Sequence, residues 1–134
     1  MNRIVIAALS AGMIFLSSCG NTKVATDQIK GDWHIEEAMG VSTVGAEKEA
    51  FISFDGNGKV NGDASVNTFM GSYVFDGESL KLDNIGMTMM LGASMEIEDA
   101  ITKAINSAAK IEIDGDKAVV RNDAGEQIMT LVRK

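Results

Sequence analysis

The sequence contains very little cysteine, proline or histidine, and each scarcity excludes a class of structure or chemistry. Its one cysteine, Cys19, has no partner for an intramolecular disulfide and cannot build a cysteine-based metal cage. Proline is absent, so the fourteen glycines must supply most of the turns. The one histidine, His34, alternates with Trp33 and Ile35 and is expected on the solvent-facing side of a strand. We therefore predict no catalytic residue, no metal site and no cofactor.

Positive charge is also scarce, with 12 lysines and arginines against 19 acidic residues. Without residues 1–18, which contain only Arg3, the net charge is (12 − 1) − 19 = −8. An acidic surface repels phosphate backbones and anionic lipid headgroups. Binding to nucleic acid, or to a membrane through a basic face, is therefore not expected.

Residues 1–18 have the pattern of a secretory signal peptide. Arg3 precedes an apolar run from Ile4 to Leu16, and two small residues follow it. The run is too short to span a membrane comfortably, since a transmembrane helix needs roughly 20 apolar residues. The sequence Leu-Ser-Ser-Cys that ends at Cys19 resembles the bacterial lipobox, in which the cysteine receives lipid and becomes the new N-terminus. The alternative is an ordinary secreted protein with an incidental cysteine.

This pattern predicts a lipoprotein that is held to a membrane by lipid on Cys19, because several acyl chains on one residue give durable anchoring. Gly20 is not an inner-membrane retention signal of the aspartate type, so we expect the outer membrane, facing the periplasm. Residues 19–29 are expected to form a tether and residues 30–134 one folded domain. The 134 − 18 = 116 remaining residues suffice for a single core, and we expect a monomer.

The folded part reads as short strands separated by glycine turns, with one helical interruption. Strands are predicted around residues 33–36, 50–55, 59–63, 73–75, 80–82, 111–113, 119–120 and 127–133. Asp55-Gly-Asn57-Gly superficially resembles a calcium loop, but Lys59 and Val60 occupy positions that need a ligand and a glycine, so it predicts a hairpin turn. From Ser94, a plausible N-cap, to Ala109 the isoleucine spacing predicts a helix. The fold class is therefore α+β: a curved antiparallel sheet of about eight short strands with one covering helix.

The segment Gly-Met-Thr-Met-Met-Leu-Gly at residues 86–92 is the most unusual in the chain. Methionine fills irregular core gaps and is also over-used at promiscuous apolar binding surfaces. The simpler interpretation is a core plug under the helix. The alternative is a groove for an acyl chain or a hydrophobic peptide, with four candidate ligand-binding residues: Met87, Met89, Met90 and Leu91.

The order of motifs resembles the META domain family, which includes HslJ-like heat-shock lipoproteins. The similarity is carried by Gly-Asp-Trp-His-Ile at 31–35, Ile-Ser-Phe-Asp at 52–55, Asn-x-Phe-x-Gly-x-Tyr at 67–73, Thr-Met-Met at 88–90 and Asp-Ala-Gly-Glu at 123–126. We expect Asn67, Gly71 and Tyr73 to be structural, with Gly71 at positive φ and the Tyr73 ring buried. Many members carry two cysteines where this chain has Val66 and Gly92 (or Leu91), so any disulfide of those relatives is lost here.

The resemblance implies a small envelope protein with no established catalytic residue. We therefore expect a non-catalytic envelope lipoprotein that supports envelope integrity or stress tolerance by binding a partner protein or an apolar ligand. The alternative is a tethered inhibitor of an attacking hydrolase such as lysozyme, which would bind its cationic target with steep salt dependence. An enzyme is the weakest hypothesis, for want of candidate residues.

Overall fold

The structure, a computed structural model, describes residues 25–93 and 95–134. The predicted leader and Cys19 lie outside the described residues. Within the described part, no helix is long and apolar enough to cross a membrane. In chain order the elements are a 3-10 helix at Thr26–Ile29, β1 Gly31–Ala38, β2 Val41–Ser42, β3 Phe51–Phe54, β4 Lys59–Asp63, β5 Thr68–Phe75, β6 Leu80–Met87, α1 Glu96–Ser107, β7 Lys110–Asp114, β8 Lys117–Arg121 and β9 Gln127–Arg133.

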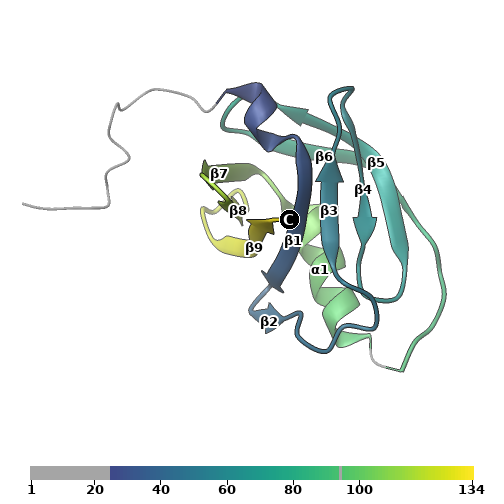
Figure 1. The fold of residues 1–134 in the computed structure, drawn as a ribbon. Coiled ribbons are helices and arrows are strands. Elements are labelled where there is room, and N and C mark those ends of the chain that lie inside the picture. Colours follow the sequence, from purple (N-terminus) through teal and green to yellow (C-terminus); the bar gives the residue numbers. More distant parts are fainter. Residues whose placement is uncertain (1–24, 94) are drawn as a thin grey trace, which may run out of the picture.

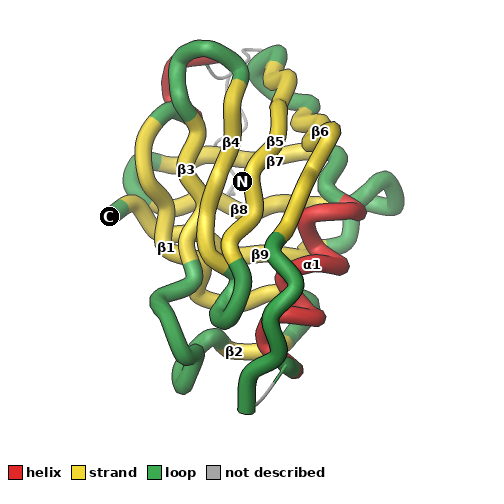
Figure 2. Tube along the Cα trace, turned by 90° about the vertical axis from the view of Figure 1, so that its right-hand side faces the viewer, coloured by secondary structure: helices red, strands yellow, loops and turns green. Residues whose placement is uncertain are grey.

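The strands form one antiparallel sheet in the order β6-β5-β4-β3-β1-β9-β8-β7, with the short β2 paired to β1. The sheet curls until its two ends meet, where Ser79 bridges to Lys110 and the Leu80 amide donates to the Ala109 carbonyl over 2.9 Å. The β7–β9 half crosses behind the β3–β6 half (Figure 2). The helix lies at the lower opening between the halves (Figure 1). The predicted α+β fold, a curved sheet with one helix, is confirmed.

Alternation along the strands places the core as the sequence predicts. Trp33 and Ile35 on β1 are fully buried, whereas His34 between them is partly exposed on the other face. The β3–β4 connection is the predicted hairpin turn, since one Asp55 carboxylate oxygen accepts from the amides of Asn57 and Lys59, each over 2.8 Å. That carboxylate satisfies the turn's own backbone, as aspartate commonly does in turns.

The helix α1 is shorter than the predicted span of 94–109, beginning at Glu96 and ending at Ser107. Its apolar stripe faces the sheet, with Ile101 and Ile105 buried, and it contacts β1, β2 and β9. The residue before the helix is Met95, whose side chain makes no capping hydrogen bond. The N-cap predicted at Ser94 lies outside the described residues.

The folded part begins before residue 30. Ile29, within the expected tether, is fully buried, and its carbonyl accepts from the indole Nε1 of Trp33 over 2.9 Å. Arg133, at the end of β9, lies 3.9 Å over the Trp33 ring and donates to the carbonyls of Gln28 and Lys30, each over 2.8 Å. Both ends of the described chain are thus fixed to one another, and the expected tether of 19–29 is shortened at its far end.

Candidate functional site

The four apolar residues singled out in the sequence separate in the structure. Met87, the last residue of β6, is partly buried and packs against the core. The next three large side chains face solvent: Met89 is 88% exposed, Met90 57% and Leu91 90%. The core plug is therefore wrong for residues 89–91, which we call the apolar segment. It follows β6 and precedes α1, and neither element covers it.

Asn67 holds this segment through its side-chain amide. Its Oδ1 accepts from the Thr88 hydroxyl and from the Met90 amide, each over 2.7 Å, and its Nδ2 donates to the Met90 carbonyl over 2.8 Å. Asn67 is itself buried, so these bonds are shielded from competing water. The backbone N–H and C=O of Met90 are thus both hydrogen-bonded to one side-chain amide, as they would be to a neighbouring strand in a sheet, although no strand lies there.

Glu98 completes the attachment from the first turn of the helix. Only 5% exposed, its carboxylate accepts from the amides of Val66 and Asn67 over 3.0 and 2.7 Å and from the Asn67 side chain over 2.5 Å. A glutamate in the first turn of a helix is ordinarily solvated and interacts with the positive end of the helix dipole, whereas Glu98 is buried. Its spacing from Ile101 and Ile105 places it on the apolar stripe, a signal that sequence reasoning missed.

The other end of the segment is held by Glu47. Its Oε2 accepts from the Ala93 amide over 2.9 Å. A Cβ at Gly92 would lie 2.4 Å from Glu47 Oε2 and 2.6 Å from Val66 Cγ2, so only glycine fits there without movement. Val66 and Gly92 are therefore neighbours, at the positions where the family resemblance places a pair of cysteines.

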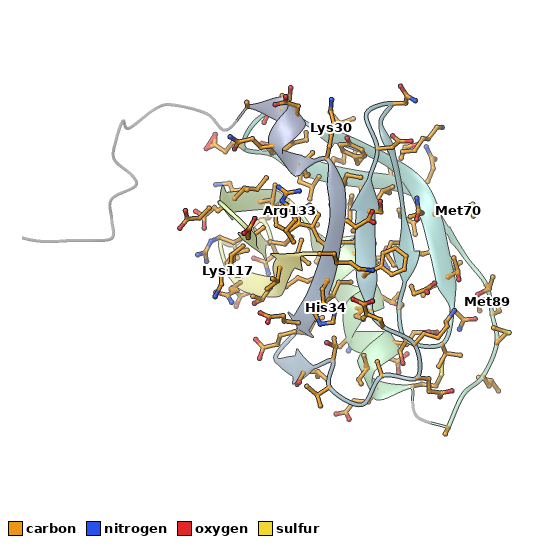
Figure 3. The ribbon with its side chains drawn as sticks, in the orientation of Figure 1. Lys30, His34, Met70, Met89, Lys117 and Arg133 are labelled. Carbon is orange, nitrogen blue, oxygen red and sulfur yellow. The ribbon has the colours of Figure 1, made fainter. Side chains whose placement is uncertain are left out.

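A fourth exposed apolar side chain, Met70, comes from β5 and is 62% exposed. The residue opposite Met70 on β6 is Gly86. Because Gly86 has no side chain, it does not cover the Met70 side chain. Met70 and Met89 point outward on the same side of the molecule, away from Lys30, where the chain enters the domain (Figure 3). Met70 and Met89 thus lie exposed on one side of the molecule, and we call Met70 and the apolar segment together the apolar surface.

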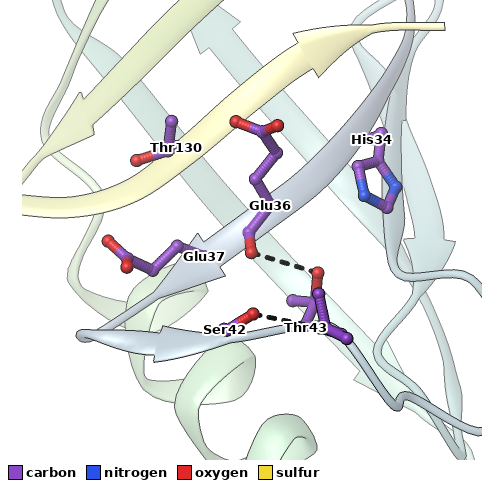
Figure 4. A pocket seen from close by; sticks show the side chains of 7 residues that line it. His34, Glu36, Glu37, Ser42, Thr43 and Thr130 are labelled. Atoms are coloured by element: carbon purple, nitrogen blue, oxygen red, sulfur yellow. Dashed lines mark hydrogen bonds between the residues drawn. The ribbon is translucent and has the colours of Figure 1, made fainter.

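A separate acidic groove of about 360 Å³ lies beside β1 and β2 (Figure 4). It is lined by His34, Glu36, Glu37, Ser42, Thr43, Val44 and Thr130. His34 Nδ1 lies 3.0 Å from Glu49 Oε2, and the Ser42 hydroxyl accepts from the Val44 amide over 3.2 Å. The serine is therefore engaged with its own turn, and the imidazole is paired with a carboxylate.

A second groove, of about 480 Å³, lies between the β5–β6 turn and the end of the helix, and includes Val74, Leu80 and Ala108. Neither of these two grooves is lined by Met87, Met89, Met90 or Leu91. Among the described residues, no group of three or more histidine and acidic side chains is placed to hold a metal ion.

Comparison with known proteins identifies the family. The family model described as "META domain" matches residues 24–134, and the chain therefore belongs to the META domain family. None of the curated proteins matches it.

Three solved structures share its fold. One protein, whose structure was solved by NMR, is 18% identical to this chain with a TM-score of 0.67, and the match covers 82% of this chain and 95% of that protein. A protein from Burkholderia xenovorans, also solved by NMR, is 17% identical to this chain with a TM-score of 0.61, and the match covers 88% of this chain and 94% of that protein. A DUF4847 family protein from Bacteroides vulgatus, solved by crystallography, is 13% identical to this chain with a TM-score of 0.62, and the match covers 82% of this chain and 98% of that protein.

The family motif Asn-x-Phe-x-Gly-x-Tyr with Thr-Met-Met acquires a physical meaning here. Asn67, which begins the first sequence, hydrogen-bonds to Thr88 and Met90 of the Thr-Met-Met sequence. Asn67, Thr88 and Met90 of the motif thus form a structural clamp, beside which Met89 and Leu91 are exposed to solvent.

Proposed function

We propose that this protein is a non-catalytic, lipid-anchored envelope protein that binds a partner protein through the apolar segment and Met70. The observation that carries the proposal is the combination of exposure and fixation. Leu91 is 90% exposed and Met89 88%, yet the backbone around them is held by the buried side chains of Asn67 and Glu98. Large apolar side chains in solvent gain nothing for folding, so their fixed presentation favours binding.

The location of this surface favours a partner protein over the anchoring bilayer. In our proposal lipid on Cys19 holds the protein to the membrane, and the chain enters the domain at the 3-10 helix. That helix and the loop after β6 lie at opposite ends of the domain (Figure 1). The acidic net charge also opposes contact with anionic headgroups.

The chemistry of the surface defines the partner. Methionine side chains adapt their shape to an apolar pocket, as they do on other promiscuous binding surfaces. Exposed acids follow the segment in the sequence, in the first turn of α1: Glu96 and Asp99. The partner is therefore an envelope protein with an apolar pocket and a basic rim, and we propose that this complex supports envelope integrity under stress.

The experiment is photo-crosslinking in intact cells with a photoreactive amino acid at position 91. Position 44 is the matched control, because Val44 is 89% exposed and equally apolar but lies beside β2. We expect one protein adduct of fixed mass from position 91 and none from position 44. Met89→Ser with Met90→Ser should abolish it, whereas Met39→Ser, at a methionine 44% exposed, should not. Lipid adducts alone, or equal adducts from both positions, would contradict the proposal.

The hydrolase inhibitor remains a second candidate because of the acidic groove. Glu36 and Glu37 line it together and are both exposed, so that they could receive a basic side chain of a cationic enzyme. Glu36→Gln with Glu37→Gln would then weaken inhibition of lysozyme in a salt-dependent manner. Absence of inhibition by the unaltered protein at low salt would exclude this candidate.

A further inference from the structure

The described methionines of this domain differ widely in exposure. Met89, Met70 and Met90 are 88%, 62% and 57% exposed, whereas Met129 is 2% exposed within the core. Met39, between β1 and β2, is 44% exposed, and Met87 and Met95 are partly buried. Three thioethers more than half exposed in a small domain are unusual for a residue that normally fills core gaps.

We propose that Met70, Met89 and Met90 are a reversible oxidation site that switches the apolar surface off. The oxidant is hydrogen peroxide. A sulfur lone pair attacks the peroxide oxygen, the O–O bond breaks, and the departing oxygen leaves as water after proton transfer. The sulfur is oxidised by two electrons to a sulfoxide. A thiol-dependent methionine sulfoxide reductase reverses the step, forming water and a disulfide in the reductase.

The fold permits this change because no described contact that holds the segment uses an exposed methionine side chain. Asn67 binds the backbone amide and carbonyl of Met90 and the hydroxyl of Thr88. Glu47 binds the backbone amide of Ala93. Oxygen added to the outward-facing sulfurs therefore makes the surface polar while the clamp beneath it stays intact. In a core methionine the same oxygen would disrupt packing.

The oxidation itself depends only on exposure, whereas its effect on binding rests on the proposed function. A partner pocket that accepts methionine would have to desolvate each sulfoxide oxygen without pairing it. The two parts are therefore tested by separate measurements on the same sample.

The experiment treats the full mature protein, in phosphatidylcholine nanodiscs, with graded hydrogen peroxide and follows each methionine by peptide mass spectrometry. We expect Met89, Met90 and Met70 to oxidise at least about tenfold faster than Met129. The melting temperature should not change when these three are oxidised and Met129 is not. In cells, peroxide should reduce the adduct from position 91 at least about fivefold, and reductase should restore it.

The matched variant replaces Met70, Met89 and Met90 by leucine, which is apolar but cannot form a sulfoxide. Its adduct should form normally and resist peroxide. Oxidation of Met129 as fast as Met89, a fall in melting temperature with surface oxidation, or equal peroxide sensitivity of the leucine variant would each overturn the proposal. Absence of any adduct before oxidation would instead refute the proposed function and with it the switch, leaving only the order of oxidation.

Discussion

Asn67 joins three separate parts of the chain through one side chain. It contacts the segment after β6 and the helix residue Glu98, from its own place before β5. Its replacement by alanine removes the side-chain partner of the buried Glu98 Oε2 and those of the Met90 amide and carbonyl, which is more costly than the loss of an exposed hydrogen bond.

We predict that Asn67→Ala lowers the free energy of unfolding by about 2–3 kcal/mol. The control is Asn61→Ala, on the exposed face of β4, which should change it by less than about 0.5 kcal/mol. N67D should be more damaging than N67A, because its side chain would face the Glu98 carboxylate and could not donate to it as the amide does. Urea unfolding measures all three effects, and equal loss in N67A and N61A would refute the clamp.

Tyr73, the only tyrosine, reports on the β3–β5 contact. Its hydroxyl donates to the Asp55 carbonyl, and its partly buried ring meets the Phe54 ring edge-on with centroids 5.0 Å apart. Burial, and then the negative charge of Asp55, raise the pKa of Tyr73 above its ordinary value of 10.0.

The expected result is a tyrosinate absorbance titration with its midpoint above 10.0 in the folded protein and near 10.0 in urea. Because the folded pKa is the higher one, this contribution to stability is complete below pH 10.0 and is lost as the pH rises through the folded pKa. Tyr73→Phe should remove that part of the alkaline loss of stability. Identical midpoints with and without urea would contradict the structure at this residue.

At the scale of elements, the β5–β6 pair shows why a glycine occupies position 71. The register shifts between Met70 and Ser72, and a Cβ at Gly71 would lie 2.6 Å from Ile85 Cδ1 and 2.8 Å from the Asp83 carbonyl oxygen. Gly71 is not among the glycines with positive φ, so the expected cause was wrong. Close approach of the neighbouring strand, and not backbone strain, requires glycine here.

Gly71→Ala should therefore destabilise the domain by about 1–3 kcal/mol through overpacking. Gly86→Ala on the partner strand is the matched control, since nothing lies within 4 Å of the added Cβ. Thermal unfolding of the two variants compares them directly. Equal melting temperatures would mean that the strands are not this close at position 71.

Local patterns predicted most elements because each pattern has a direct physical cause. The alternation around His34 reports the two faces of β1, and the isoleucine spacing around Ile101 reports the buried face of α1. Non-local features were missed for the opposite reason. The clamp from Asn67 to Glu98 joins residues 31 positions apart, and the Ser79–Lys110 bridge depends on how far the sheet curls. Likewise, an apolar run alone cannot say whether residues 89–91 are covered.

At the scale of the whole molecule, the 3-10 helix at Thr26–Ile29, which follows the predicted anchor in the sequence, and the loop after β6 lie at opposite ends of the domain (Figure 1). Cys19 lies outside the described residues, so its lipidation stays a prediction. Cys19→Ser should abolish metabolic labelling with a palmitate analogue and release the protein from the membrane fraction, because lipid is the only predicted anchor. Continued labelling of this variant would end the lipoprotein hypothesis.

The central claim is that residues 89–91 serve binding and not packing. Its most direct test is a paired measurement on the variant Met89→Ser with Met90→Ser, compared with Met129→Ala. We predict that the double variant keeps its free energy of unfolding within about 1 kcal/mol and loses the crosslinked adduct from position 91. Met129→Ala, at a buried site, should cost about 2–5 kcal/mol. A double variant that unfolds as easily as Met129→Ala, or one that keeps the adduct, would contradict the claim.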